Sequence, residues 1–155
     1  MFADPLDAET PDIEMDADEV NAFLRGQGWG CLTMARDSVA YSIPVSFGYD
    51  GDSTFYFQLQ TDEGCEKLPY LDATTTATLV VPEVRPPEWT SVMVRGPLEV
   101  LTDDGITEAL AVIGDNAWFP LAPWSDGQAP THLSLYALEA EELTGRSSAV
   151  GTLTD

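Results

Sequence analysis

Lys67 is the residue most suited by its type to bind a ligand, because it is the only lysine in a chain with 27 acidic and 6 basic residues. An ammonium group binds a phosphate or another small anion as a point charge. The same side chain could instead lie on the surface, paired with a nearby acid such as Glu63. The sequence leaves both interpretations open.

A second pattern lies just before Lys67, in the stretch Val39–Gln60. Its first half is mostly apolar but is interrupted by Pro44 and Ser46. A proline and a serine inside such a strand indicate a sheet edge or a place where a ligand meets the backbone. The second half alternates apolar with polar residues, and the pair Asp50-Gly51 between the halves predicts a turn. We therefore expect a β-hairpin here.

No catalytic triad or metal-binding cluster is apparent in the sequence. His132 is the only histidine and precedes an alternating apolar stretch, so we interpret it as structural. Cys31, Cys65 and His132 are too few for a four-ligand zinc site, and we expect two free thiols. Neither a P-loop nor a dinucleotide-binding fingerprint is present. Enzymatic chemistry would therefore need a bound cofactor, and the catalytic residues stay unassigned.

The net charge of −21 also restricts the function. The acids are spread along the chain, which favours adaptation to molar salt over a local cation-binding or DNA-mimicking surface. No basic patch could neutralise phosphates, so nucleic-acid binding is not expected. We find no run of about 20 apolar residues and no leader pattern, and we expect a cytoplasmic protein with no membrane span.

The remaining pattern predicts a mostly β domain with flanking helices. We expect a loose acidic arm over 1–14, one domain over 15–146 and a polar tail over 147–155. About six consecutive strands favour an antiparallel, nearly closed barrel. The segment 116–129 is rich in tryptophan and proline and could cover a cleft or pack against the barrel. The other expected elements are a helix from Asp16 or Asp18 to Gly26 or Gly28, a strand Trp29–Ala35, a short helix that is distorted by Pro69 or starts late because of it, a strand Ala73–Val81, a loop Pro82–Glu88, a strand Trp89–Leu101 bent at Gly96-Pro97, a helix from Asp103-Asp104 to Ile113 with Ile106, Leu110 and Ile113 on one stripe, and a strand Thr131–Leu143.

Several motifs, by their order and spacing along the chain, resemble those of the FMN-binding split-barrel superfamily. This superfamily is also called the pyridoxamine 5'-phosphate oxidase-like group. The chain is most similar to the branch of nitroimidazole-resistance and flavin-reductase-like proteins. The resemblance covers residues 18–146 and implies a six-stranded antiparallel split β-barrel. It also implies a homodimer with FMN in a cleft at the subunit interface. The motifs are YSIPVSFGYD at 41–50, Phe55-Tyr56-Phe57, Gly64 with Lys67, Trp89-Thr90-Ser91-Val92 with Gly96, and YALEAEELTGR at 136–146.

The resemblance also implies which residues bind the cofactor. The flavin would lie along Pro44, Val45 and Ser46. Its ring and ribityl chain would be approached by Phe57 and Gln58, and its phosphate would be bound by Lys67. The cleft would be reached from the partner chain by Trp89 and Ser91.

The sequence departs from this family at positions near the phosphate. Tyr41, Ser46 and Glu66 stand where vitamin-B6 oxidases have basic residues, so we do not expect that activity. Gln58 stands where the nitroimidazole-related branch often has histidine. The first hypothesis is an FMN-dependent oxidoreductase acting on a small molecule, with reduced nicotinamide as electron donor. The second is a non-catalytic flavin carrier, or a split-barrel protein that binds another cofactor such as a deazaflavin or haem.

Overall fold

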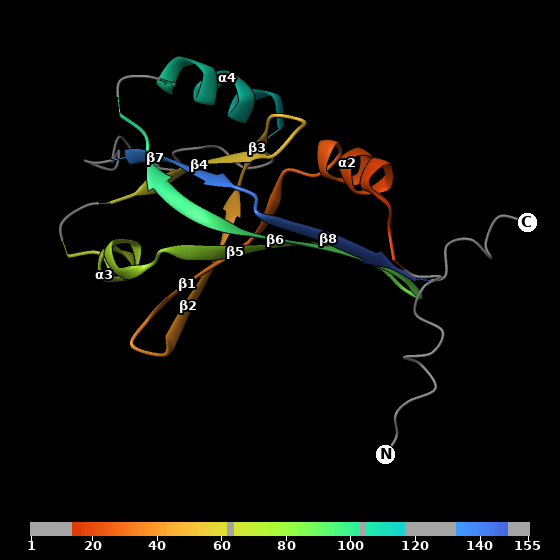
Figure 1. Ribbon diagram of the computed structural model, residues 1–155, viewed down its shortest axis with the longest axis horizontal. Helices are drawn as coiled ribbons and strands as arrows, with labels where there is room; N and C mark the ends of the chain where they lie inside the picture. Colours follow the sequence, from red (N-terminus) through yellow and green to blue (C-terminus); the bar gives the residue numbers. More distant parts are fainter. Residues whose placement is uncertain (1–13, 62–63, 103–104, 117–132, 149–155) are drawn as a thin grey trace, which may run out of the picture.

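The computed structural model describes residues 14–61, 64–102, 105–116 and 133–148. The described chain forms one eight-stranded antiparallel sheet with three helices around it (Figure 1). No described helix is long and apolar enough to cross a membrane. The elements are α2 (Ala17–Arg25), β1 (Trp29–Arg36), β2 (Val39–Ser46), β3 (Gly48–Tyr49), β4 (Thr54–Gln60), α3 (Lys67–Ala73), β5 (Thr76–Arg85), β6 (Glu88–Val100), α4 (Ile106–Asn116), β7 (Leu133–Glu139) and β8 (Glu142–Ser147).

The long strand β6 organises the sheet. One of its edges pairs with β5, while the other pairs first with β8 and then with β7. The strand order is β2-β1-β5-β6-β7-β4-β3, so the path begins at β2 and ends at β3. This arrangement is a split barrel, and it confirms the predicted antiparallel fold with eight strands where about six were expected.

The interior of the barrel follows the alternation of the strands. Phe55, Phe57 and Leu59 of β4 are buried, as their spacing predicts, and face the same core as Phe47. Phe47 and Phe55 meet edge to face with their ring centroids 5.6 Å apart. Three fully buried phenylalanines therefore hold the region where β2 gives way to β3 and β4.

The predicted hairpin over Val39–Gln60 is only partly correct. Only β3 pairs with β4, in the register Gly48↔Tyr56 and Tyr49↔Phe55. The longer first arm, β2, pairs along its whole length with β1 instead. The two arms separate at Phe47, whose side chain is buried and whose N–H donates to the Gly28 carbonyl at 3.0 Å. Burial of one aromatic residue therefore redirects the chain.

The helix α2 begins and ends close to the positions that the sequence indicates. Asp16 is its N-cap and accepts from the Glu19 N–H at 2.8 Å, while the Glu19 carboxylate accepts from the Asp16 N–H at 2.8 Å. This reciprocal capping box satisfies two backbone donors at the start of the helix. Val20 and Leu24 are buried against the barrel.

The predicted loop Pro82–Glu88 is wrong, because β5 continues to Arg85 and β6 begins at Glu88. Only Pro86 and Pro87 form the turn. Pro82 is tolerated because β1 pairs with β5 only over Thr78, Leu79 and Val80. Beyond that ladder, the missing N–H of Pro82 takes no hydrogen bond from the pairing with β1.

The predicted single strand Thr131–Leu143 is divided in the structure. Residues 131–132 lie outside the described residues, β7 ends at Glu139, and β8 continues through Ser147. The break lies opposite Gly96, where the Glu141 N–H donates to the Arg95 carbonyl at 2.8 Å. β6 therefore changes partner near the predicted bend Gly96-Pro97.

The helix α4 packs on β3 through a glycine. A Cβ atom at Gly48 would lie 2.6 Å from the backbone N and Cα of Ile113. Ala109 and Ile113 are buried together with Leu135 of β7, whereas Leu110 is 42% exposed. The predicted stripe containing Leu110 is therefore wrong at that residue. The predicted cap Asp103-Asp104 and most of the segment 116–129 lie outside the described residues.

The turn at Asp50-Gly51 is confirmed and suggests a stability test. The Asp50 Oδ1 atom accepts from the N–H groups of Asp52, Ser53 and Thr54 at 2.8, 3.0 and 3.1 Å. We expect Asp50→Ala to lower the free energy of unfolding by about 1–3 kcal/mol, because several donors lose an acceptor. Asp52→Ala removes the same charge from the same turn and should change it by less than about 0.5 kcal/mol. Urea unfolding in molar KCl measures both, and equal losses would contradict this explanation.

Candidate functional site

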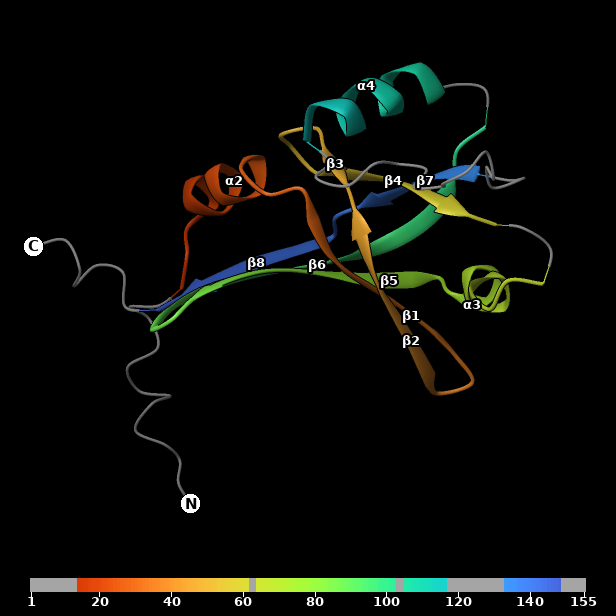
Figure 2. The same cartoon turned by 180° about the vertical axis from the view of Figure 1, so that it is seen from behind.

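The strand pairing of the barrel is interrupted between β2 and β4, which approach each other without forming a ladder. We call this interruption the split. The chain crosses one end of it at Phe47, and α3 lies at the other end (Figure 2). Tyr41 of β2 stacks on Tyr70 of α3 with ring centroids 5.0 Å apart and an interplanar angle of 14°. The stacked tyrosines therefore join α3 to β2 at that end.

Lys67 is the first residue of α3 and stands at this end of the split. Its Nζ atom donates to the Gln60 carbonyl at 3.0 Å, at the end of β4. None of the ion pairs among the described residues includes Lys67. The predicted alternative partner, Glu63, lies outside the described residues. The ammonium group is thus fixed to the backbone of β4, and two of its three N–H donors can serve an anion.

Gln58 lies on the outward side of β4, opposite in direction to the buried Phe57. Its Oε1 atom is buried and has no hydrogen-bond partner among the described residues. A buried acceptor without a donor costs roughly 1–3 kcal/mol, so such an atom calls for an explanation. A ligand hydroxyl or N–H group at this position would satisfy it.

The residues predicted on β2 point in two directions. Pro44 is exposed and Ser46 is half-buried on the outer side, while Val45 is 7% exposed and belongs to the core. Phe57 is likewise fully buried. Val45 and Phe57 can therefore offer only backbone groups to a ligand outside the barrel, whereas Pro44, Ser46 and Gln58 can offer side chains.

Trp89 and Ser91 lie far from Lys67 in the same chain. They follow the tip of the β5–β6 hairpin, where Trp89 pairs with Val84, whereas α3 precedes the opposite end of β5 at Thr76. At roughly 3.3 Å per residue, Thr76 and Val84 are about 26 Å apart along this strand. One chain therefore does not bring the eight predicted residues together.

The electrostatic surroundings of Lys67 are mixed. Burial, followed by the negative charges of Glu66 and Cys65, raises the pKa of Tyr41 above its ordinary value. Glu66 precedes α3, and its carboxylate accepts no capping hydrogen bond from the helix. A carboxylate thus adjoins the lysine in a position where an anionic ligand would be repelled, although molar salt screens such repulsion beyond roughly 3 Å.

Sequence reasoning missed three features at this end of the split. They are the stacking partner Tyr70, the Gln60 carbonyl that holds Lys67, and the Cys65 thiol, whose Sγ lies 3.7 Å from the same carbonyl. Cys65 and Cys31 are both free thiols, as predicted. The spacing of Lys67 and Tyr70 on one helix could have indicated that both face β2 and β4.

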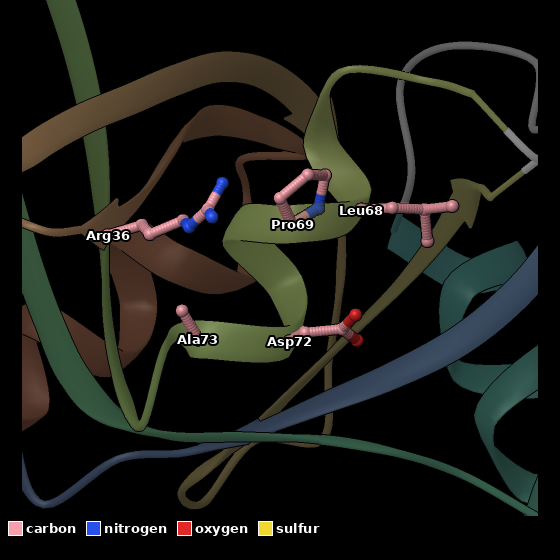
Figure 3. A pocket seen from close by; sticks show the side chains of 5 residues that line it. All are labelled: Arg36, Leu68, Pro69, Asp72 and Ala73. Atoms are coloured by element: carbon pink, nitrogen blue, oxygen red, sulfur yellow. The ribbon is translucent and has the colours of Figure 1, made fainter.

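A second hollow lies on the far side of α3. It is a groove of about 470 Å³ between the end of β1 and the helix, lined by Arg36, Leu68, Pro69, Asp72 and Ala73. Arg36 extends from β1 toward α3, whereas the side chain of Asp72 points away from Arg36 (Figure 3). The groove contains none of the predicted cofactor residues, so we place the candidate site at the split.

One family model matches the amino-acid sequence of this chain. The match covers residues 16–147, and the family is described as pyridoxamine 5'-phosphate oxidase. The chain belongs to this family. None of the curated proteins matches it. The resemblance drawn from the motifs is thus confirmed at the level of the family.

Solved structures similar to this family member agree on the fold. An FAD-binding protein from Mesorhizobium loti has 22% identity and a TM-score of 0.69, over 87% of this chain and 96% of that chain. A candidate 5-nitroimidazole antibiotic resistance protein from Bacteroides thetaiotaomicron has 18% identity and a TM-score of 0.65, over 87% and 86%. An FAD and haem binding protein from Mycobacterium smegmatis has 16% identity and a TM-score of 0.62, over 84% and 70%.

Proposed function

We propose that this member of the pyridoxamine 5'-phosphate oxidase family binds FMN across the split and is an FMN-dependent oxidoreductase for a small molecule. The observation that carries the proposal is the position of Lys67 at the α3 end of the split. The only lysine of the chain is held there by the Gln60 carbonyl and has no ion pair among the described residues. The FAD-binding protein among the similar structures supports a flavin as the ligand class.

The described residues fit such a cofactor at two points. The Lys67 ammonium would bind its phosphate as a charge-assisted donor. The buried Gln58 Oε1 would accept from a ribityl hydroxyl or a ring N–H and so lose its unsatisfied state. Pro44 and Ser46 would border the ligand from β2, where the second edge of the strand has no partner among the described strands.

A homodimer would complete the site. Trp89 and Ser91 of β6 pair with the end of β5 that is far from Lys67. They could therefore reach the split only from a second copy of the chain. We therefore propose a cofactor cleft between two subunits. Two free thiols, Cys31 and Cys65, suit a reducing compartment, and we propose the cytoplasm.

When bound, FMN would supply the redox chemistry, which is hydride transfer between reduced nicotinamide and a small-molecule substrate. The chain would supply binding and orientation. The three lining positions Pro44, Ser46 and Gln58 would exclude water from one side of the cofactor. No side chain is assigned as a general acid.

The second candidate is a carrier or a protein for another cofactor, such as a deazaflavin or haem. Glu66 beside Lys67 favours it, because a carboxylate at the phosphate end weakens attraction for a dianion. One of the structures with a similar fold, from Mycobacterium smegmatis, is described as an FAD and haem binding protein, which supports haem as an alternative ligand.

The visible absorption spectrum tests the proposal. The protein is purified in molar KCl without added cofactor, and its spectrum is recorded before and after gel filtration. We expect two flavin bands that persist and then bleach when reduced nicotinamide is added without oxygen. A haem or deazaflavin spectrum would favour the second candidate. A protein that stays colourless after incubation with excess FMN would rule out the proposal.

A further inference from the structure

We propose that the groove on the far side of α3 binds the adenosine phosphate half of a reduced nicotinamide dinucleotide. This inference assigns a place to the electron donor of the proposed function and rests on that function. The groove has a volume of about 470 Å³ and is lined by Arg36, Leu68, Pro69, Asp72 and Ala73. Sites for small molecules typically enclose roughly 300–1,000 Å³, so the groove is large enough for one nucleotide.

The groove lies across α3 from the Lys67 ammonium. A helix turns by about 100° per residue, so Pro69 is about 200° around the axis of α3 from Lys67, and Ala73 follows Pro69 after about one turn. Lys67 donates to the end of β4, whereas Pro69 and Ala73 lie on the side of the helix that Arg36 approaches (Figure 3). Because a helix is only about 10 Å wide, the split and the groove are separated by the thickness of α3 alone.

The cation of the groove has only a weak partner. The Nε atom of Arg36 lies 3.8 Å from the Oδ2 atom of Asp37, which is too long for a hydrogen bond. Both side chains are exposed, and an exposed ion pair of this kind contributes little free energy. The Arg36 guanidinium makes no hydrogen bond among the described residues. Its planar fork of N–H donors therefore remains available to the oxygen atoms of a phosphate.

The carboxylate of the groove is directed away from this cation. Figure 3 shows the side chain of Asp72 on the side of α3 that is opposite to Arg36. Burial, followed by the negative charge of Asp72, raises the pKa of Tyr136 in β7, which agrees with this direction. Asp37 is the other carboxylate beside Arg36, and its side chain is 87% exposed, where salt screens its charge. An anion bound to Arg36 would thus meet little repulsion from the groove itself.

The two walls of the groove are held together by a buried threonine. Thr74 caps the end of α3 and is only 9% exposed. Its Oγ1 atom accepts from the Ala35 N–H at 3.1 Å and donates to the Ala35 carbonyl at 3.2 Å. These bonds join the residue after Ala73 to the residue before Arg36. The groove is therefore formed before a ligand arrives, which lowers the cost of binding.

A nicotinamide dinucleotide has the chemistry that this groove accepts. Its nicotinamide would face the flavin in the split, and its diphosphate carries an adenosine half that must lie outside the split. Adenine is a flat ring that can cover the exposed Pro69 and Ala73, while the adjoining phosphate would accept from the Arg36 guanidinium. In a chain of net charge −21, few surfaces offer a phosphate such a donor. The dinucleotide would thus pass from the split over α3 into the groove.

Titration calorimetry of the FMN-loaded protein in molar KCl tests the proposal with three probes. They are adenosine 5'-monophosphate, the oxidised dinucleotide, which cannot reduce the flavin, and oxidised nicotinamide mononucleotide, which lacks the adenosine half. We expect Arg36→Gln to raise the dissociation constants of the first two probes by about 5- to 10-fold and to leave the third within about twofold. Arg85→Gln is the matched control, because it removes the same charge at the far end of β5, where Arg85 pairs with Glu83 at 3.2 Å. It should leave all three constants within about twofold.

Ala73→Phe provides a second variant, which fills the groove without changing a charge and should also weaken binding of the first two probes. Binding of adenosine 5'-monophosphate that is absent, or unchanged in both variants, would overturn the proposal. If the mononucleotide depends on Arg36 and the dinucleotide does not, the groove is a site for a free nucleotide, which would overturn it as well. Flavin spectra of the same samples separate these results from failure of the proposed function. A protein that retains FMN but shows no effect of Arg36→Gln loses only this inference, whereas a wild type that binds no FMN loses the proposed function.

Discussion

Lys67→Gln should weaken FMN binding more than any other single substitution of a polar residue in the described chain. The Lys67 ammonium lies at the α3 end of the split and has no competing ion pair among the described residues. A hydrogen bond to a charged partner is worth about 1.5–3 kcal/mol, so the dissociation constant should rise by about 10- to 100-fold. Fluorescence quenching of FMN, titrated with protein in molar KCl, measures this constant.

Two further variants make this titration specific. Arg25→Gln removes the same unit of charge from the last turn of α2, outside the candidate site, and should leave the dissociation constant within about twofold. Lys67→Arg keeps a cation at the site and should recover part of the affinity, although its fork geometry differs. If Lys67→Gln binds FMN as tightly as the wild type, Lys67 is not a phosphate ligand, and the split loses its main support as the cofactor site.

Gly96→Ala should produce the largest loss of stability. A Cβ atom at Gly96 would overlap the Glu139 carbonyl oxygen and lie 2.8 Å from the Glu139 carbonyl carbon and 3.2 Å from the Glu141 nitrogen. All three atoms belong to the backbone at the junction of β7 and β8, so no side chain can rotate away. Overpacking typically costs about 1–3 kcal/mol, and we expect about 3 kcal/mol or more here.

Gly114→Ala is the matched control for this prediction. Nothing lies within 4 Å of a Cβ atom at Gly114, which is in α4. Alanine in a helix is more favourable than glycine by up to about 1 kcal/mol, so this variant should be slightly more stable than the wild type. Urea unfolding in molar KCl compares the two variants. Equal stability of Gly96→Ala and the wild type would show that the junction of β7 and β8 can move away from β6 at no cost.

The elements that could be predicted from the sequence are those governed by local rules. The capping residue Asp16, the turn residues Asp50 and Gly51, and the alternation of β4 each depend on neighbours within a few positions. Pro69 lies in the first turn of α3, where a proline interrupts no helical hydrogen bond, so of the two predicted outcomes the structure has the helix that starts late. Such features need no knowledge of the rest of the chain.

The errors all arose from contacts between distant residues. The partner of β2 is β1 and not β4, because Phe47 enters the core and turns the chain. Pro82 lies within a strand because the β1 ladder ends before it. The last predicted strand is broken because β6 exchanges β8 for β7 near Gly96. Periodicity reports which side of a strand is buried, but it does not report which strand lies beside it.

The same division holds for the candidate site. The sequence by itself determined that a single lysine follows an interrupted strand, and that one histidine and two cysteines are too few for a four-ligand zinc site. Only the tertiary structure decided that Pro44, Ser46 and Gln58 face outward while Val45 and Phe57 are buried, because facing depends on strand register. It also decided that Lys67, in α3, and Trp89, in β6, lie beside opposite ends of β5. The path of the chain through the sheet sets the distance between them.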